Sequence, residues 1–218
     1  VGMDKEFTKK VLAAADLPVA PEVILKGRTE LSEDEKQQLG LPVFVKPARG
    51  GSSIGVSKVT TWEEFPAAVD LALEDDEKIL VEPEIVGKEV EIGVLHYADG
   101  TLLASVPALL AGIDDSDEGF YGFDTKYLDN VVTAEIPAPF APELTEKLRD
   151  MAIRAFEALN CEGLSRVDFF VTEESVYINE INTLPGFTPI SMYPQVLAAS
   201  GVEYPALLEA LIEQALAK

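Results

Sequence analysis

Two short runs of polar residues in the second half of the chain carry the most specific chemistry. One runs from Arg166 to Asp168 and the other from Asn179 to Asn182. Successive side chains of a strand point to opposite faces, so Arg166 and Asp168 share a face, as do Glu180 and Asn182. If an odd, three-residue loop joins the two strands, both pairs lie on the same face, with Asp168 opposite Glu180. We therefore predict a hairpin with an odd loop.

This hairpin is a candidate metal site. Directly opposed carboxylates repel each other by about 0.2–1 kcal/mol unless a cation lies between them. Asp168 and Glu180, together with the amide oxygen of Asn182, form a set of hard oxygen donors of the kind that Mg²⁺ prefers. The alternative is a solvated polar face on which Arg166 neutralises Asp168. These residues by themselves leave both interpretations open.

A loop rich in glycine and serine is a candidate phosphate site. It follows a buried strand and runs from Lys46 to Gly55, with Ser52 and Ser53 after its glycines. Glycines let backbone N–H groups approach an anion closely, and hydroxyl groups add donors. Lys46 strengthens this hypothesis, because a lysine leaving a buried strand needs an anionic partner. The alternative is an ordinary glycine hairpin, and the loop lacks the Gly-Lys-Ser/Thr ending of a Walker loop.

Two further segments are weaker candidates. The segment from Lys78 to Glu89 is an apolar strand that runs into a short linker, whose backbone could bind adenine while Glu89 accepts hydrogen bonds from ribose. The segment from Thr183 to Met192 is a turn that enters a helix, where the N–H of Gly186 could face an oxyanion. A plain connector and a plain strand-to-helix turn are the respective alternatives.

An α+β chain of two lobes is needed to position these residues. Hydrophobic spacing, caps and turn residues predict two helices at the carboxyl end and a lid or binding loop over the polar residues 112–129. The other predicted elements are helices over 3–16, 61–74 and 142–160, strands over 42–47 and 78–82, a hairpin that begins at 89 and turns at 98–100, and a hairpin over 164–183.

Composition excludes some classes of function. The 218 residues contain 39 acidic and 17 basic side chains, a formal charge of -22, which argues against binding to nucleic acid. No apolar run approaches the ~20 residues of a membrane span, and the first residues lack the basic-then-apolar layout of a signal peptide. The single cysteine fits a reducing compartment, so we expect a cytoplasmic protein. Because the chain opens on Val1, we also expect a piece of a longer protein.

Taken in order, five motifs closely resemble those of the D-alanine–D-alanine ligases. They are Val45-Lys46-Pro47 with its Gly-Gly-Ser-Ser loop, Val81-Glu82-Pro83-Glu84, Thr125-Lys126-Tyr127, Arg166-Val167-Asp168, and the run from Asn179 to Thr188. The resemblance implies an ATP-grasp fold, in which two lobes with mainly antiparallel sheets hold ATP between them. It implies a central lobe over residues 1–85, a C-terminal lobe over 86–218, and a lid at about 110–130. It also implies that an N-terminal substrate domain is absent, which would leave this chain able to bind ATP but inactive alone.

The same resemblance implies roles for individual residues. Those implied to bind ATP are Lys5, Lys46, Ser52, Ser53, Glu82, Pro83, Glu84, Ile85, Glu89, Phe120, Lys126 and Asn179. The implied ligands of two Mg²⁺ ions, for which Mn²⁺ could substitute, are Asp168, Glu180 and Asn182. The residues implied to act in catalysis are Ser52, Lys126, Tyr127, Arg166 and Gly186. Those implied to bind the amino-acid substrates are Arg166, Gly186, Ser191 and Met192.

The implied reaction joins two D-alanines through an acyl phosphate, for peptidoglycan synthesis in the bacterial cell wall. Lys126 and Tyr127 resemble the lid of dipeptide-forming members, because relatives that make D-alanyl-D-lactate carry a histidine there and residues 110–130 contain none. The implied partners are small-molecule substrates and, for the full-length protein, a second copy in a homodimer. Another ATP-grasp carboxylate–amine ligase and a non-catalytic ATP-binding module are the alternatives.

Overall fold

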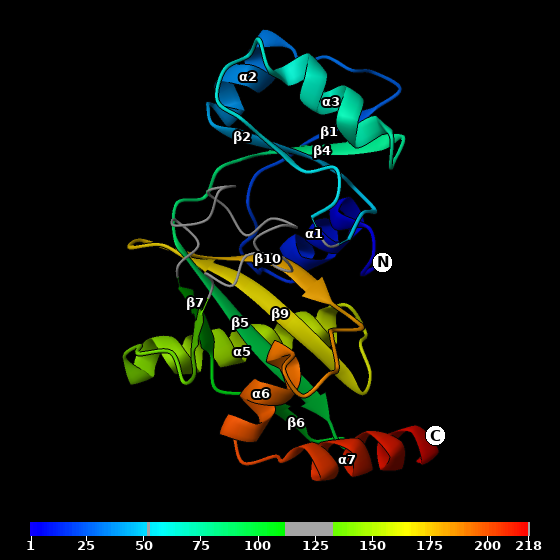
Figure 1. Cartoon of the computed structure of the whole chain (residues 1–218), viewed down its shortest axis with the longest axis vertical. Helices are drawn as coiled ribbons and strands as arrows, with labels where there is room; N and C mark the ends of the chain where they lie inside the picture. Colours follow the sequence, from blue (N-terminus) through cyan, green and yellow to red (C-terminus); the bar gives the residue numbers. More distant parts are fainter. Residues whose placement is uncertain (52, 112–132, 218) are drawn as a thin grey trace.

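The chain folds into two lobes, each built on its own antiparallel sheet (Figure 1). This is a computed structural model, which describes residues 1–51, 53–111 and 133–217. Four of the predicted site residues, Ser52, Phe120, Lys126 and Tyr127, lie outside the described residues, as does most of the predicted lid. Among the described residues, no helix has both the length and the hydropathy that crossing a membrane requires.

The first lobe contains a four-stranded sheet in the order β1-β4-β2-β3. Two helices cover one face of this sheet and enclose an apolar core (Figure 1). Alternation along β2 explains the arrangement, because Val43 and Val45 are buried in that core while Phe44 and Lys46 face the other way. The elements are β1 (Val23–Lys26), α2 (Glu33–Leu39), β2 (Val43–Pro47), β3 (Ser57–Val59), α3 (Phe65–Leu73) and β4 (Lys78–Pro83).

The second lobe contains a larger sheet in the order β10-β9-β5-β7-β8, with β6 paired to β5. Its strands are β5 (Lys88–His96), β6 (Leu102–Ala104), β7 (Ala108–Ala111), β8 (Thr133–Glu135), β9 (Leu164–Val171) and β10 (Val176–Asn182). Its helices are α5 (Pro142–Ala158), α6 (Met192–Ala199) and α7 (Tyr204–Leu216). The long helix α5 packs against one face of the sheet, while α6 packs against β5 and is followed by α7.

The central strand β5 shows how the two faces of this sheet differ. Val90, Ile92 and Val94 are fully buried in the core that contains α5. The alternate residues Glu91 and Gly93 point to the opposite face. At Gly93 this face is closed by α6, because a Cβ there would lie 2.5 Å from Leu197 Cδ2. Nearer the start of the strand, the same face turns toward the first lobe.

Helix α1 (Lys5–Ala14) contacts both lobes. Its amino end is attached to the first lobe, where the Lys5 N–H donates to the Ala48 carbonyl at 2.9 Å. Its buried Leu12 belongs instead to the core of the second lobe. At its carboxyl end, Arg154 of α5 donates to the Ala15 carbonyl at 2.9 Å. Helix α1, which precedes both sheets in the chain, therefore packs against both lobes.

The predicted α+β class is confirmed, and two local predictions need correction. Helix α2 was not predicted, although Ser32 and Glu35 form a capping box at its start. The predicted start of α3 was too early, because Glu64 accepts from the Thr60 and Thr61 N–H groups and the helix begins only at Phe65.

Candidate functional site

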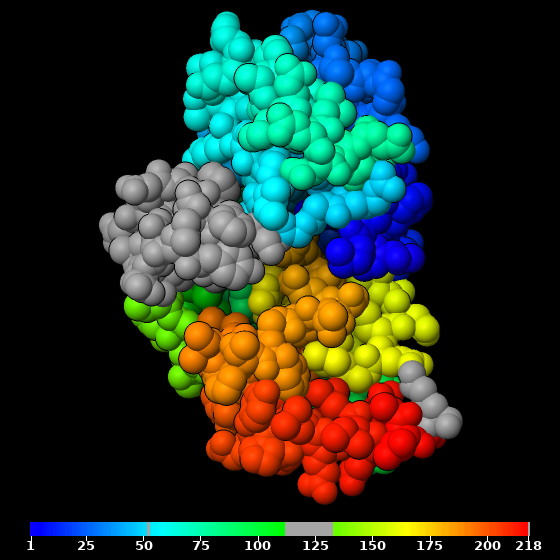
Figure 2. Space-filling model, turned by 45° about the vertical axis from the view of Figure 1, so that its right-hand side comes forward, coloured from blue at the N-terminus to red at the C-terminus, as the bar shows by residue number. Residues whose placement is uncertain are grey.

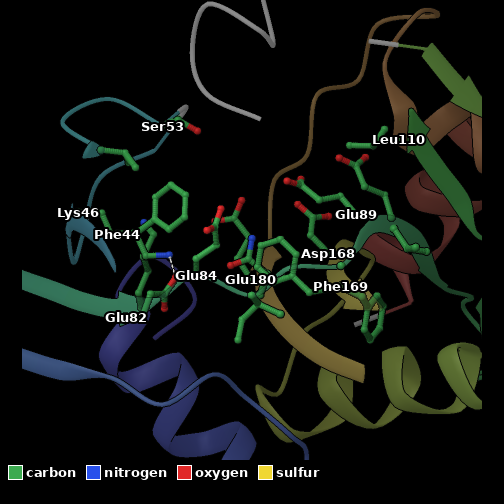
Figure 3. Close-up of a pocket in the computed structure, with 18 of the residues that line it drawn as sticks. Phe44, Lys46, Ser53, Glu82, Glu84, Glu89, Leu110, Asp168, Phe169 and Glu180 are labelled. Atoms are coloured by element: carbon green, nitrogen blue, oxygen red, sulfur yellow. Dashed lines mark hydrogen bonds and ion pairs between the residues drawn. The ribbon is translucent and has the colours of Figure 1, made fainter. Parts of the chain in front are cut away.

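A cavity of about 430 Å³ lies between the two lobes. Figure 3 shows Lys46 and Glu82 on its first-lobe side and Glu89 and Asp168 on its second-lobe side. In Figure 2 the first lobe, in blue and cyan, lies above the yellow and orange segments of the second. The cavity is lined by these predicted site residues: Lys5, Lys46, Ser53, Glu82, Pro83, Glu84, Ile85, Glu89, Asp168, Asn179 and Glu180.

Two lysines stand on the first-lobe wall of this cavity. Lys46 extends from β2 and pairs with the carboxylate of Glu82 on the neighbouring strand β4. Lys5 extends from the first turn of α1 and donates to the Gly50 carbonyl at 2.7 Å. The Lys5 ammonium group therefore contacts the glycine-rich loop, and Lys46 stands where that loop begins. An anion beside this loop would meet two positive charges that the strand and the helix hold in place.

Glu82 is almost completely buried and stays ionised. Burial by itself would raise its pKa, but the charges of Lys46 and Lys9 and their hydrogen bonds outweigh burial and lower the pKa from 4.5 to about 2. Each carboxylate oxygen has a lysine partner, with Lys46 on Oε1 and Lys9 on Oε2. Glu82, which was predicted as an ATP contact, lines the cavity, and its side chain also pairs with both lysines.

The glycine-rich loop is anchored at its root by an arginine. Arg49 donates from its backbone N–H and its guanidinium to the buried carboxylate of Asp76, at 2.9, 3.0 and 2.5 Å. Further along the loop, Ser53 and Gly55 adopt positive φ angles of 57° and 70°. Such angles are uncommon for a non-glycine residue such as Ser53 and often occur in binding loops. The loop is therefore fixed at its base and sharply turned at its tip.

The linker between β4 and β5 forms another wall of the cavity. Glu84 pairs with Lys58 of β3 at 2.7 Å, and its backbone N–H donates to the Pro42 carbonyl at 3.0 Å. Its N–H is thus already used within the first lobe, which leaves the neighbouring backbone groups of Pro83 and Ile85 as the candidates for contact with a base. Glu89 follows at the start of β5 and also lines the cavity.

The second-lobe wall brings the predicted carboxylates together. Asp168 of β9 pairs in register with Glu180 of β10, and Arg166 pairs with Asn182. The predicted pairing is confirmed, but the predicted odd loop is wrong. Val171 pairs with Val176 across a loop of even length, and a bulge after Ile178 restores the register.

Arg166 is engaged with the carboxylates beside it. Its Nε and Nη2 donate to the two oxygens of Asp168, both at 2.7 Å, and Nε lies 3.1 Å from Glu91 Oε2. Burial alone would lower the pKa of the guanidinium, but Asp168, Glu91 and Glu180 outweigh burial and raise this pKa above its ordinary value. Glu91 was missed in the sequence, although its alternation with Glu89 along one strand indicated that both share a face.

The residues present fit a magnesium site. Asp168 and Glu180 face each other across two strands, and the Asn182 amide donates to Asp168 Oδ2 at 2.9 Å, which leaves the amide oxygen as an acceptor. Within the described part of the chain, no group of three or more His, Cys, Asp or Glu side chains forms a metal site. A metal here would therefore need amide and phosphate oxygens as well, which is common for Mg²⁺.

A second group of predicted residues lies together outside the cavity lining. Ser191 is the N-cap of α6, and Met192 is its first residue. Ser191 Oγ accepts from the Thr188 N–H at 3.1 Å, and a Cβ at Gly186 would lie 3.0 Å from the same oxygen. Gly186 and Ser191 are therefore neighbours at a helix N-terminus, where backbone donors favour an anion.

Sequence reasoning missed the apolar residues of the cavity. They include Phe44, Val90, Leu109, Leu110, Phe169 and Phe170, from strands of both lobes, and Val56, which directly precedes β3. Several of them point to the same face as a predicted polar residue, as Phe44 does with Lys46. That alternation was the available signal, but it does not tell which face borders a cavity.

Comparison with known proteins gives consistent matches. Residues 11–213 match the family model described as "D-ala D-ala ligase C-terminus". A curated D-alanine–D-alanine ligase of Corynebacterium efficiens is 66% identical over 215 residues, which are 99% of this chain and 60% of that protein. The chain thus spans about 60% of the length of the curated relatives it matches.

Solved structures agree with the sequence matches. The D-alanine–D-alanine ligase of Coxiella burnetii has a TM-score of 0.84 and 37% identity, over 99% of this chain and 57% of that chain. The Bacillus anthracis ligase complexed with ATP has a TM-score of 0.82 and 27% identity, over 99% of this chain and 66% of that chain. The predicted ATP-grasp fold is confirmed. The chain belongs to the family of the D-alanine–D-alanine ligase C-terminal domain.

Proposed function

We propose that this chain supplies the ATP-binding and catalytic part of a D-alanine–D-alanine ligase. The main support is the arrangement of charge across one cavity. Lys5 and Lys46 stand on the first-lobe wall, and Asp168 and Glu180 stand on the second-lobe wall. A nucleotide triphosphate carries anionic phosphates that suit the lysines, and a bound Mg²⁺ would join those phosphates to the carboxylates.

In this proposal Asp168, Glu180 and Asn182 hold Mg²⁺, two ions when the site is full, with Mn²⁺ as a possible substitute. When bound, the metal would neutralise charge on the phosphates. Lys5 and Lys46 bind the phosphate oxygens, and the turned loop at Ser53 lies beside them. The apolar side chains of the cavity would surround adenine, while the linker backbone contacts its edge and Glu89 accepts from ribose.

The proposed reaction has two steps. The carboxylate of the first D-alanine takes the terminal phosphoryl group of ATP, which gives an acyl phosphate and ADP. The amine of the second D-alanine then attacks the acyl carbon, and phosphate leaves. Arg166 donates two hydrogen bonds to Asp168. Its remaining N–H groups, with the backbone N–H of Gly186, would stabilise the oxyanion that forms when the amine attacks.

The remaining roles follow the same proposal. Ser191 and Met192 at the start of α6 would bind the carboxylate of the second D-alanine, because a helix N-terminus attracts anions. Lys126 and Tyr127, which the resemblance implies are lid residues, lie outside the described residues. The product would serve peptidoglycan synthesis in the cytoplasm, and the whole protein would act as a homodimer.

Calorimetry with Mg-ATP tests the nucleotide half of the proposal. We expect the chain to bind ATP more tightly with Mg²⁺ than without it. Asp168→Asn should weaken Mg-ATP binding at least about tenfold while leaving metal-free ATP binding nearly unchanged. Asp70→Asn removes the same charge from the exposed surface of α3 and serves as the matched control. Wild-type protein that fails to bind Mg-ATP would refute the proposal.

Phosphate release tests the substrate half. The chain would be fused to the part of the Corynebacterium efficiens relative that it does not cover, and compared with the chain alone. We expect phosphate release that depends on D-alanine in the fusion and little in the chain alone. Phosphate release that does not depend on D-alanine in the fusion would favour another carboxylate–amine ligase. Offering D-lactate beside D-alanine measures the choice of second substrate.

A further inference from the structure

Lys9 of α1 is a buried lysine that does not line the cavity. Its side chain is 5% exposed, and its Nζ lies 2.5 Å from Glu82 Oε2, 3.2 Å from the Ala20 carbonyl and 3.3 Å from Glu22 Oε2. A buried ammonium group is rare unless it is paired, because its desolvation is unfavourable. No role has been assigned to it so far, although it contacts the carboxylate that holds Lys46.

Lys9, Glu82 and Lys46 form a continuous chain of charges. Glu82 binds Lys46 through Oε1 and Lys9 through Oε2, so its position is set from both sides (Figure 3 shows its contact with Lys46). These three groups carry two positive charges and one negative charge, and Glu22 is a second carboxylate on the Lys9 side, away from Lys46. Without Lys9, the Glu82 carboxylate would fully offset the charge of Lys46.

Glu22 is the second carboxylate beside Lys9. It contacts Lys9 at a longer distance than Glu82 does, and burial raises the pKa of its carboxyl group. Lys46 pairs with the other carboxylate oxygen of Glu82, at the cavity wall. The charge that Lys46 presents to a ligand therefore depends chiefly on Glu82 and on how far Lys9 compensates it.

We propose that Lys9 is a positioning residue for nucleotide phosphate: through Glu82 it holds Lys46 in place and keeps positive charge available at the cavity wall. This inference rests on the proposed binding of Mg-ATP. A residue that only stabilised the fold would affect all ligands of the cavity alike. Lys9 should instead affect phosphate-bearing ligands and leave adenosine almost untouched.

Calorimetry on three variants tests the proposal. Lys9→Met should weaken Mg-ATP binding about tenfold or more, with adenosine binding unchanged. Lys9→Met combined with Glu82→Gln removes the carboxylate that is no longer compensated, and it should regain most of the lost affinity. Lys10→Met is the matched control, because the next residue of the same helix is an exposed lysine, and it should bind like the wild type.

The outcomes separate the possibilities. Lys9→Met that binds Mg-ATP as tightly as the wild type would overturn the proposal, as would a double variant that recovers nothing or an equal loss for adenosine. Circular dichroism would fix a temperature at which every variant is folded. If Lys9→Met does not fold, Lys9→Gln keeps a donor toward Glu82 without the charge, and the same losses are expected.

Crystal structures without ligand test the positioning separately. In Lys9→Met, the Glu82 carboxylate should leave its present orientation and the Lys46 ammonium group should move with it. If both side chains keep their wild-type positions, the proposal is wrong even where Mg-ATP binding is weakened. If wild-type protein does not bind Mg-ATP, the proposed function fails, and these structures still decide whether Lys9 positions Lys46.

Discussion

Replacing Glu82 with glutamine should change how the stability of the protein depends on pH. The folded protein holds this carboxylate between Lys46 and Lys9, which lowers its pKa from 4.5 to about 2. A group whose pKa is lowered by folding contributes stability above its unfolded pKa and loses it as pH falls through the folded value. The contribution of Glu82 should therefore be complete near neutral pH and decline below about pH 4.5.

The size of the effect follows from the two pKa values. The difference between 4.5 and about 2 corresponds to about 3 kcal/mol at pH 7, since each pKa unit is worth about 1.36 kcal/mol. At pH 3 the same linkage leaves about 1 kcal/mol. The wild type should thus lose about 2 kcal/mol of its advantage over Glu82→Gln between these two conditions.

Urea unfolding at a series of pH values measures this difference. Glu63→Gln serves as the control, because it removes a carboxylate from an exposed position and should give a flat difference from the wild type. Other acidic groups titrate alike in all three proteins, so their effects cancel in the comparison. A gap between the wild type and Glu82→Gln that stays constant from pH 7 to pH 3 would refute the assigned ion pairs.

Two further predictions concern other parts of the molecule. Gly93→Ala should lower the free energy of unfolding by about 1–3 kcal/mol, because its Cβ would meet Leu197, whereas Gly51→Ala, with open space around it, should be nearly neutral in thermal unfolding. Asp76→Asn should destabilise by about 1–3 kcal/mol at neutral pH. Since the hydrogen bonds from Arg49 lower the pKa of Asp76, this loss should shrink in acid, which unfolding at pH 3 and 7 would show.

The candidate site was predictable from sequence where side-chain alternation is regular. The pairing of Asp168 with Glu180 was derived from the strand period together with an assumed three-residue loop, and the pairing itself is confirmed. The reasoning about loop length failed, because a bulge adds one residue to β10 after Ile178 and so compensates for an even loop. Bulges have no reliable local signature, and a register can be right when the connection predicted for it is wrong.

Other features depended on packing that the sequence does not reveal. Phe7 is an apolar residue of the first predicted helix, yet half of it is exposed and its ring centroid lies 4.6 Å from the Lys78 ammonium group. No sequence motif singled out Lys9, and only the fold brings it to Glu82, far along the chain. Contacts between distant segments therefore decided which charged residues matter at the cavity.

The way that α1 is shared limits how the two lobes can be exchanged between relatives. Its amino end is tied to the first sheet, while Leu12 fills part of the core under the second. A chimera joined near residue 85 would pair one parent's helix with the other parent's core and would disturb packing in both. The two lobes therefore form one unit of recombination, and homologous exchanges should succeed best when α1 and α5 come from the same parent.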